Sequence, residues 1–344
     1  MLTQKQLDEI KEKLESSQNP LFFFDNDVDG LCSFLIMQRA IGRGKGVSIK
    51  SFPGLSESYI KKVEELNPDC VFILDKPLVD KEFLQKLEEK NIPITWIDHH
   101  EVELDKDLIN LADYYNSYPS TEPTTYLAYK AVGKKEDMFL AMIGCIGDVY
   151  MPEFSREFSE KYPELFNSKI KVFDSLYLTE IGKASRLLNF ALKDSTTNVV
   201  NMLRYLMKIK DVYDIMHENK QNKEFHLRAN QLTKIYDKHI EKAENNLTDE
   251  KLLVYTYSGD TAMSSELANG IYFKHKNKFI VVAFRKQDKL NASIRGKSAK
   301  KILAKIIKKM PFVTGGGHEE ACGAQIPTEL FEEFVRRVRD EIEN

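Results

Sequence analysis

The sequence predicts an α/β protein in which a parallel sheet with helices on both faces is followed by a helical connector and a smaller α+β domain. Over about the first 150 residues, apolar runs alternate with amphipathic segments, as in parallel sheets covered on both faces. Residues 176–250 keep helical periodicity without a strand signal, and hairpin-type strands return after them. A chain of 344 residues exceeds one ordinary core. The predicted domains are residues 1–175, 176–250 and 251–344.

Each expected element follows from its local pattern. The expected strands of the first domain are LFFF (21–24), VSIKSF (47–52), CVFIL (70–74) and ITWI (94–97). Amphipathic spacing predicts helices from about Leu31, near 56–66 and near 80–90. The last domain is expected to contain strands at KLLVYTYS (251–258) and within 278–296, then a glycine-rich turn before the closing helix.

The composition is typical of a globular cytoplasmic protein. Hydrophobic residues make up 42% of the chain, and no apolar run reaches the ~18 residues that a membrane helix requires. The first residues, MLTQKQLDEIKEKLES, resemble a polar helix rather than a signal peptide, so no membrane partner is expected. The four cysteines lack CxxC spacing, and we interpret them as reduced core residues rather than zinc ligands or disulfides.

Charge is distributed unevenly along the chain. The net charge is −3, but the stretch from Lys274 to Lys309 contains thirteen Lys or Arg residues and a single acid, Asp288. Acidic residues cluster in the first half and in the middle. This asymmetry predicts one region that holds cations and another that attracts phosphates. For AKKILAKIIKKM, whose Ile and Leu residues have helical spacing, a solvated helix face is the alternative interpretation.

The segment FFFDNDVDGL places three aspartates directly after an apolar strand. Asp25, Asp27 and Asp29 alternate, so they would lie on a common side if the chain stayed extended. Their mutual repulsion would then have to be neutralised by something bound. The segment therefore predicts a metal site.

Other candidate ligands also follow apolar runs. Asp75 follows CVFIL, Asp98 with His99 and His100 follows ITWI, and Asp148 follows AMIGCIG. Taken alone, two adjacent histidines are more often buried or solvated residues than metal ligands, and Asp148 is typical of a helix C-terminus or a turn. In parallel sheets, however, ligands bind beyond the carboxyl ends of the strands. We therefore expect these segments to converge on one crevice.

The types of ligand atom restrict which metal ions and which reactions fit the predicted site. The set contains carboxylates and an imidazole but no thiolate, which suits Mn²⁺ or Mg²⁺ better than zinc. A shared carboxylate can hold two cations ~3.5–4 Å apart, an arrangement that supports phosphoester hydrolysis. The expected metal ligands are Asp27, Asp29, Asp75, His99 and Asp148.

These motifs together resemble those of the DHH phosphoesterase superfamily with its DHHA1 carboxy-terminal domain. The resemblance rests on DNDVDG, Asp75, IDHH and GDV, followed by GGGHEEACGAQIP, and it spans about residues 20 to 328. The first motif is most similar to the RecJ-like branch, and IGKASRLLNFAL resembles archaeal RecJ-like proteins. Each motif alone is weak, whereas their ordered combination is specific.

The resemblance implies roles for individual residues of the first domain. It gives Asp75 the position of a ligand that bridges two divalent cations, Mn²⁺ preferred and Mg²⁺ as the second candidate. Asp25 stands where other branches have a histidine, and is expected either to bind metal or to support a ligand. His100 matches the imidazole that approaches the scissile phosphate, and Asp98 matches the residue that supports the histidine pair.

The resemblance also implies substrate contacts. In the DHHA1-like segment, Arg295 matches a basic residue suited to a phosphate diester. The expected contacts at GGGH are Gly315, Gly316, Gly317 and His318, with a tight turn as the alternative interpretation. Asn116 is a further candidate, in YNSYPST, which replaces a shorter Asn-Pro turn of the family.

The leading expectation is a two-metal exonuclease that acts on single-stranded DNA or RNA and releases nucleoside monophosphates. One alternative is a phosphodiesterase for nanoRNA, pAp or cyclic dinucleotides. Short oligonucleotides are plausible partners because the chain ends soon after the DHHA1-like segment, without the additional OB-fold of bacterial RecJ. The other alternative is a scaffold for replication or DNA repair proteins in which catalysis is secondary.

Overall fold

The computed structural model describes residues 1–50, 54–102 and 104–343. The chain divides into two compact units, Met1–Asn230 and Gln231–Asn344. Each unit has its own sheet. The helices of residues 176–250 are divided between the units, because helix α13 (Lys223–Asn245) begins in the first unit and ends in the second.

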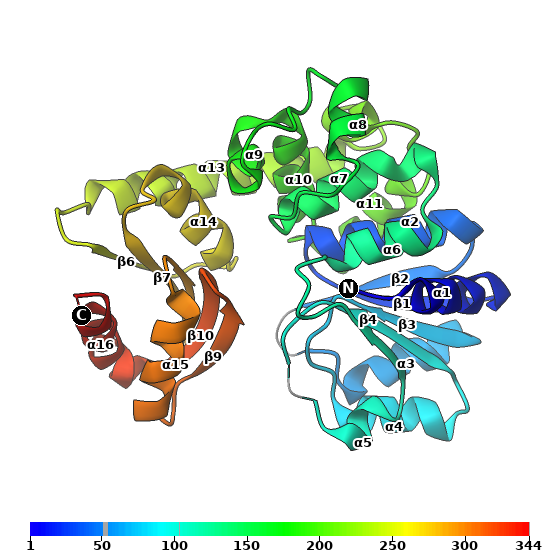
Figure 1. Cartoon of the computed structure of the whole chain (residues 1–344), viewed down its shortest axis with the longest axis horizontal. Helices are drawn as coiled ribbons and strands as arrows, with labels where there is room; N and C mark the ends of the chain where they lie inside the picture. Colours follow the sequence, from blue (N-terminus) through cyan, green and yellow to red (C-terminus); the bar gives the residue numbers. More distant parts are fainter. Residues whose placement is uncertain (51–53, 103, 344) are drawn as a thin grey trace. The chain divides into compact units, whose positions relative to one another are not determined.

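The first unit is built on a five-stranded parallel sheet with strand order β2-β1-β3-β4-β5 (Figure 1). Its strands are β1 (Pro20–Asp25), β2 (Lys45–Ile49), β3 (Cys70–Leu74), β4 (Ile94–Asp98) and β5 (Asp113–Asn116). The four strands expected from the sequence are confirmed, although residues 51 and 52 of the second run lie outside the described residues. Strand β5 has no counterpart in the sequence prediction, because its residues DYYN form no apolar run.

Helices cover both faces of this sheet, as the sequence predicts (Figure 1). The helices on one face include α1 (Gln4–Ser16), α2 (Val28–Ile41), α6 (Thr124–Val132) and α7 (Met138–Gly147). The other face carries the 3₁₀ turn η1 (Glu57–Tyr59), α3 (Ile60–Leu66), α4 (Lys81–Glu89) and the short α5 (Lys106–Ile109).

The phenylalanine run of β1 contributes to the cores on both sides of the sheet. Phe24 stacks on Phe34 of α2 with ring centroids 5.0 Å apart. Phe23 points to the opposite face and meets Phe83 of α4 edge-on at 5.4 Å. Burial on both faces explains why the strands read as continuous apolar runs.

The remainder of the first unit is helical. Its elements are η2 (Lys135–Asp137), α8 (Ser155–Lys161), α9 (Val172–Leu178), α10 (Glu180–Ala191), α11 (Thr196–Leu206) and α12 (Val212–Met216). Among the described residues of the whole chain, no helix combines the length and apolar character needed to cross a membrane. All four cysteines are free thiols; three of them are buried and Cys70 is half-buried.

The second unit contains a mixed five-stranded sheet with strand order β6-β7-β8-β10-β9. Its strands are β6 (Leu252–Tyr257), β7 (Phe279–Lys286), β8 (Lys289–Arg295), β9 (Thr314–His318) and β10 (Ala321–Pro327). Helices α15 (Ala299–Lys309) and α16 (Phe331–Glu343) share a core with the sheet, α14 (Ser264–Lys274) packs on β7 and β8, and η3 (Thr328–Leu330) precedes α16.

The predicted glycine-rich turn is wrong in its local structure. The GGGH residues belong to β9, which pairs antiparallel with β10 at the edge of the sheet. Gly315 and Gly317 lie so close to β10 that a Cβ would approach its backbone oxygens to 2.3 and 2.4 Å. Close strand pairing, rather than a turn, therefore requires glycine at these two positions.

Candidate metal centre

The first acidic motif turns from a strand into a helix instead of staying extended. Strand β1 ends at Asp25, Asp27 is the N-cap of α2, and Asp29 lies in its first turn. The Asp27 carboxylate accepts a hydrogen bond from the Gly30 backbone N–H at 2.9 Å, the contact that favours Asp at an N-cap. A Cβ on Gly30 would lie 2.5 Å from the Asp25 backbone oxygen. The prediction that extended alternation gathers the aspartates is therefore wrong, and a tight strand-to-helix turn brings them together instead.

The N-terminus of α6 holds Asp29. The backbone N–H groups of Thr124 and Thr125 donate to its two carboxylate oxygens at 2.9 and 2.8 Å. The Thr125 hydroxyl donates to the Asp29 backbone oxygen at 2.8 Å. A helix N-terminus stabilises negative charge through its N–H groups and its dipole. These threonines were missed by the sequence prediction, although Pro-Thr-Thr after YNSYPSTE is a recognisable helix start.

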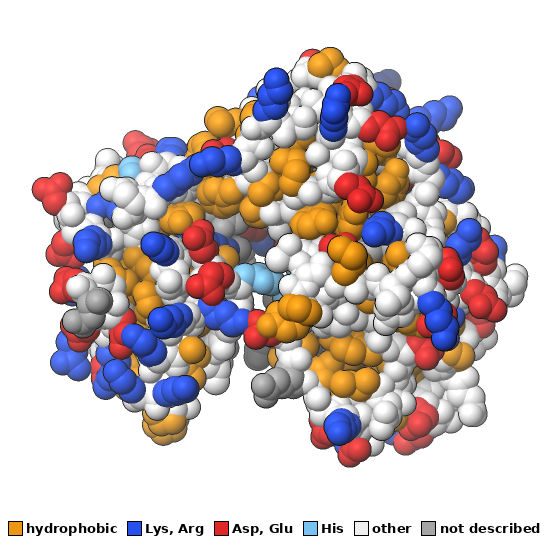
Figure 2. All heavy atoms as spheres, viewed as in Figure 1, with side chains coloured by type: hydrophobic (Ala, Val, Ile, Leu, Met, Phe, Trp, Pro, Cys, Tyr) orange, Lys and Arg blue, Asp and Glu red, His pale blue; other side chains and the backbone are white. Residues whose placement is uncertain are grey.

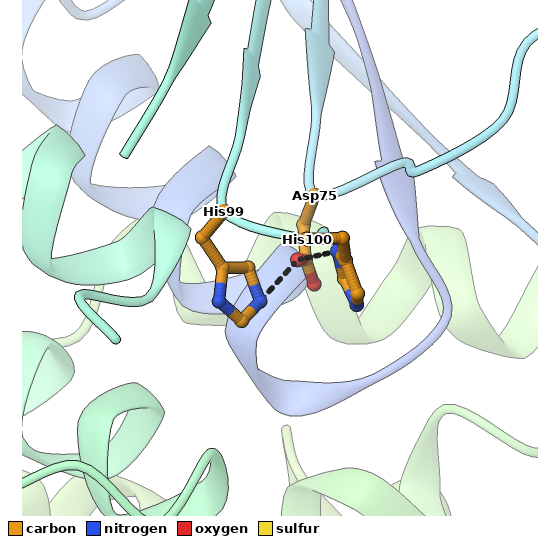
Figure 3. Close-up of side chains that lie close together, drawn as sticks. All are labelled: Asp75, His99 and His100. Carbon is orange, nitrogen blue, oxygen red and sulfur yellow. Dashed lines mark ion pairs between the residues drawn. The ribbon is translucent and has the colours of Figure 1, made fainter. Parts of the chain in front are cut away.

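Asp75 lies directly after β3 and contacts both adjacent histidines (Figure 3). Its Oδ1 is 3.3 Å from Nε2 of His99 and 3.8 Å from Nδ1 of His100. The Asp75 backbone has φ +59°, a left-handed conformation that Asp adopts more readily than most residues. The strand end thus directs one buried carboxylate between two imidazoles.

His99 connects Asp75 with two further carboxylates. Its Nε2 lies 3.8 Å from Asp29 Oδ2 and 3.6 Å from Asp148 Oδ2. Asp148 is the C-cap of α7, the helix-end position that its sequence context allowed. The imidazole is 3% exposed, so it is available to ligands only from within the cluster.

Asp98 orients His100. Its Oδ1 lies 2.8 Å from His100 Nδ1, and its Oδ2 accepts the His100 backbone N–H at 3.3 Å. Burial lowers the pKa of His100, but the hydrogen bond and charge of Asp98, with Asp148 and Asp27, raise it to about 9. Asn116 donates through Nδ2 to the His100 backbone oxygen at 2.9 Å, so this candidate lies beside the pair.

The predicted ligands form three groups that share members. Within each group, the donor atoms lie within 4.8 Å of one another. The groups are Asp75–His99–His100, Asp29–His99–Asp148 and Asp25–Asp27–Asp75. All six predicted metal ligands are included, together with His100. Because Asp75 and His99 each occur in two groups, neighbouring cations could share ligands, and the donor types fit Mn²⁺ or Mg²⁺.

The carboxylates of the cluster are electrostatically strained without cations. Burial and the neighbouring carboxylates raise the pKa of Asp27 to about 7. Burial raises the pKa of Asp148 to about 6, and burial with repulsion from four aspartates raises the pKa of Asp75 well above its usual value. Bound divalent ions would reverse these shifts, because they favour the charged carboxylates.

Lys76 is a buried cation at the centre that the sequence prediction missed. Its Nζ lies 2.8 Å from Asp25 Oδ1, and its side chain is 5% exposed. The Trp96 indole N–H donates to the Lys76 backbone oxygen at 2.8 Å. The sequence feature that could have indicated this cation is the position of Lys76 directly after the predicted bridging aspartate, Asp75.

The predicted substrate-binding residues of the second unit have different environments. The Arg295 side chain is buried and donates to Asn269, Ser265 and the Ile294 backbone oxygen at 2.5 to 2.8 Å. The residues of β9, including Gly316 and His318, are exposed. Roles for these residues and for Asn116 stay predictions.

The basic stretch of the second unit is largely a surface feature. Figure 2 shows Lys and Arg side chains gathered on the face that carries α15. The α15 residues Lys301, Lys305, Lys308 and Lys309 are exposed, while Leu303 and Ile306 are buried. Glu341 pairs with Lys305 and Lys309. Part of this charge is therefore balanced within the domain, as expected of a solvated helix face.

Comparison with known proteins gives one family match. Residues 249–344 match the DHHA1 domain. The search of curated protein sequences found no match.

Solved structures share the fold of the chain at low sequence identity. The crystal structure of RecJ from Thermus thermophilus in complex with Mn²⁺ has a TM-score of 0.71 and 16% identity, over 99% of this chain and 55% of that chain. An exonuclease RecJ bound to manganese has a TM-score of 0.65 and 18% identity, over 99% and 95% of the two chains. The DHH domain of a protein described as a member of a ribosomal protein family has a TM-score of 0.70 and 15% identity, over 98% and 89%.

The present chain thus spans about half the length of the Thermus RecJ. The likeness extends over the parallel sheet, the helical region and the carboxy-terminal sheet, since it covers nearly every residue of this chain. Residues 249–344 thus match the DHHA1 domain, and the chain as a whole shares its fold with two RecJ structures and a DHH-domain structure.

Proposed function

We propose that the protein is a divalent-metal-dependent phosphodiesterase that removes nucleoside monophosphates from the ends of single-stranded DNA or RNA. The observation that carries this proposal is the cluster of carboxylates and imidazoles supplied by separate strand and helix ends. The RecJ structures named above contain Mn²⁺, and their likeness to this chain supports the same class of cofactor and reaction.

The residues that would hold the ions are those of the three overlapping groups, with Asp75 shared between neighbouring positions. When bound, two divalent ions would lower the pKa of a water and stabilise the charge that develops on the phosphate. Asp29 is held by the α6 N–H groups and Asp75 by the end of β3, so two ligands are positioned by rigid elements. Such preorganisation reduces the reorganisation that catalysis requires.

His100 is suited to binding the scissile phosphate. Although burial lowers the pKa of His100, the hydrogen bond and charge of Asp98 raise it to about 9 in the metal-free protein, which favours a protonated ring. A protonated ring donates through Nδ1 to Asp98, which fixes its orientation. Its second nitrogen, Nε2, is then a cationic N–H donor that matches a phosphate oxygen.

The second unit supplies features that suit a polyanion. Strand β9 presents an exposed backbone with little side chain, and exposed lysines of α15 add positive charge. We propose that the β9 edge, with His318, binds substrate phosphates, and that buried Arg295 supports the adjacent strands.

Digestion of end-labelled single strands tests the proposal. Single-stranded DNA and RNA of two to about thirty nucleotides would be incubated with Mn²⁺, with Mg²⁺ and with a chelator. Stepwise shortening with release of monophosphates, abolished by the chelator and by Asp75→Asn, is the expected result. Cleavage confined to two to five nucleotides would instead indicate a short-substrate phosphodiesterase. If no length of either nucleic acid is cleaved with either metal, the proposed function is wrong.

A further inference from the structure

The metal-binding groups of the cluster differ in their chemistry. One of the two groups that contain an imidazole is formed by Asp29, His99 and Asp148. The group formed by Asp25, Asp27 and Asp75 contains only carboxylates, and Lys76 is paired with one of them at 2.8 Å. We call the first the histidine subsite and the second the carboxylate subsite. A protein cation therefore lies at the edge of one proposed metal position.

Lys76 is held in this place by the fold. Its side chain is 5% exposed and Asp25 is 18% exposed, so the ion pair is largely removed from solvent. The Trp96 indole, itself fully buried, anchors the Lys76 backbone from the neighbouring strand. Lysine is rarely buried unless it is paired, and removing one partner of such a pair leaves an uncompensated charge. The arrangement thus differs from a surface lysine that reaches the acid by chance.

The ion pair changes what Asp25 can offer a metal. One Asp25 oxygen already contacts an ammonium group, which competes with a divalent ion for its electron density. The ammonium charge also repels a second cation brought close to it. Asp27 and Asp75 each offer a carboxylate oxygen within 4.8 Å of Asp25 and of one another, so the same position keeps two further acidic ligands.

We propose that Lys76 acts as a built-in cation that neutralises Asp25, so that the carboxylate subsite binds its divalent ion more weakly than the histidine subsite. Asp25 is then a positioning residue, and Asp27 and Asp75 are the ligands of the weaker ion. This inference rests on the proposed metal-dependent function, because it concerns the same centre. It implies that the two ions bind with different affinities and that the weaker one can exchange between turnovers.

Manganese titration of the full chain without substrate tests this inference. Free Mn²⁺ would be followed by its electron paramagnetic resonance signal. Wild-type protein is expected to show two affinity classes. Lys76→Met should tighten the weaker class by at least about tenfold, since a unit charge beside a divalent ion is removed, and should shift the stronger class by less than about threefold. Lys76→Arg, which retains the charge, should keep the two classes distinct.

A matched control is Lys90→Met, which breaks the exposed Lys90–Glu64 pair in the same unit. It should leave both affinities unchanged, because exposed pairs are screened by solvent. Two equivalent sites in the wild type, or unchanged affinities in Lys76→Met, would overturn the inference.

A neutral double variant keeps the inference testable if Lys76→Met alone does not fold. Asp25→Asn with Lys76→Met removes both charges of the pair while preserving most of its volume. If Asp25 only balances Lys76, the double variant retains two classes within about threefold of the wild-type affinities, because the two lost charges offset each other. Loss of one class would show that Asp25 is a full ligand and would overturn the inference. Since the titration involves no hydrolysis, its failure is distinct from failure of the digestion experiment.

Discussion

Replacing Asp27 by asparagine should stabilise the metal-free protein while impairing metal binding. Asparagine is as good an N-cap as aspartate, so the hydrogen bond from the Gly30 N–H can be kept. What the substitution removes is a negative charge that burial, Asp25 and Asp29 disfavour. Stability and function should therefore change in opposite directions at this position.

The magnitude follows from the raised pKa of Asp27. Between about pH 4 and pH 7 the folded protein retains a proton that the unfolded chain has released, so the unfolding free energy falls as pH rises. A pKa raised from 3.8 to about 7 corresponds to at most about 4 kcal/mol at pH 8. Asp27 is partly exposed and its neighbours can take up protons in its place, so we expect a gain of about 1–3 kcal/mol.

Urea unfolding with a chelator at pH 8 and pH 5 measures this effect. The gain of Asp27→Asn should be full at pH 8 and smaller at pH 5, where the folded wild type keeps the proton. Asp105→Asn is the matched control, because Asp105 is an exposed N-cap of α5 and should change stability by less than about 0.5 kcal/mol. Mn²⁺ should stabilise the wild type more than Asp27→Asn. An equal gain at both pH values, or a variant less stable than the wild type at pH 8, would refute the electrostatic explanation.

Four further substitutions test the centre, the β9 edge and the end of α7. Asp75→Asn should reduce metal-dependent hydrolysis at least ~10²-fold and reduce the shift of melting temperature by Mn²⁺, because the carboxylate subsite loses a ligand while Asp29, His99 and Asp148 are kept; retained activity would exclude Asp75 as a shared ligand. Gly317→Ala should cost about 1–3 kcal/mol of unfolding free energy, because φ is +141° and the Cβ would meet the Ala321 oxygen. A Cβ added at Gly316 would have nothing within 4 Å, so Gly316→Ala should lower the unfolding free energy by less than about 0.5 kcal/mol. An equal loss for Gly316→Ala and Gly317→Ala would contradict this reasoning. Val149, just after α7, has φ +56°, a conformation that glycine adopts more readily than valine. Val149→Gly should therefore not lower the melting temperature, and a large decrease would exclude backbone strain at this position.

The sequence predicted the location of the centre because topology alone brings parallel strand ends together. Asp25, Asp75 and Asp98 each lie at or just beyond a strand end, and the sheet places those ends at one edge. This rule predicts which segments meet at that edge, but it does not predict the individual contacts between their residues. Thr124 reaches Asp29 across 95 residues, and Lys76 reaches Asp25 across 51, through packing that no local pattern encodes.

Two local predictions were wrong because a tertiary or capping preference outweighed the pattern. Alternating aspartates suggested an extended chain, but Asp27 is a strong N-cap and Gly30 permits the sharp turn. Three consecutive glycines suggested a turn, because glycine is depleted in strands. At β9 the pairing with β10 requires the chains to approach closely, and this requirement overrides the weak intrinsic preference.

The distribution of charge compensation indicates where cations are needed. The chain places a cationic side chain or a pair of helix N–H groups against three carboxylates: the α6 N–H groups for Asp29, Lys76 for Asp25 and His100 for Asp98. Burial and neighbouring charges raise the pKa values of Asp27, Asp75 and Asp148. A need for added positive charge is thus evident at three of these six aspartates. Removing divalent ions should therefore raise the proton affinity of Asp27, Asp75 and Asp148, and substituting any of the three by asparagine should weaken metal binding.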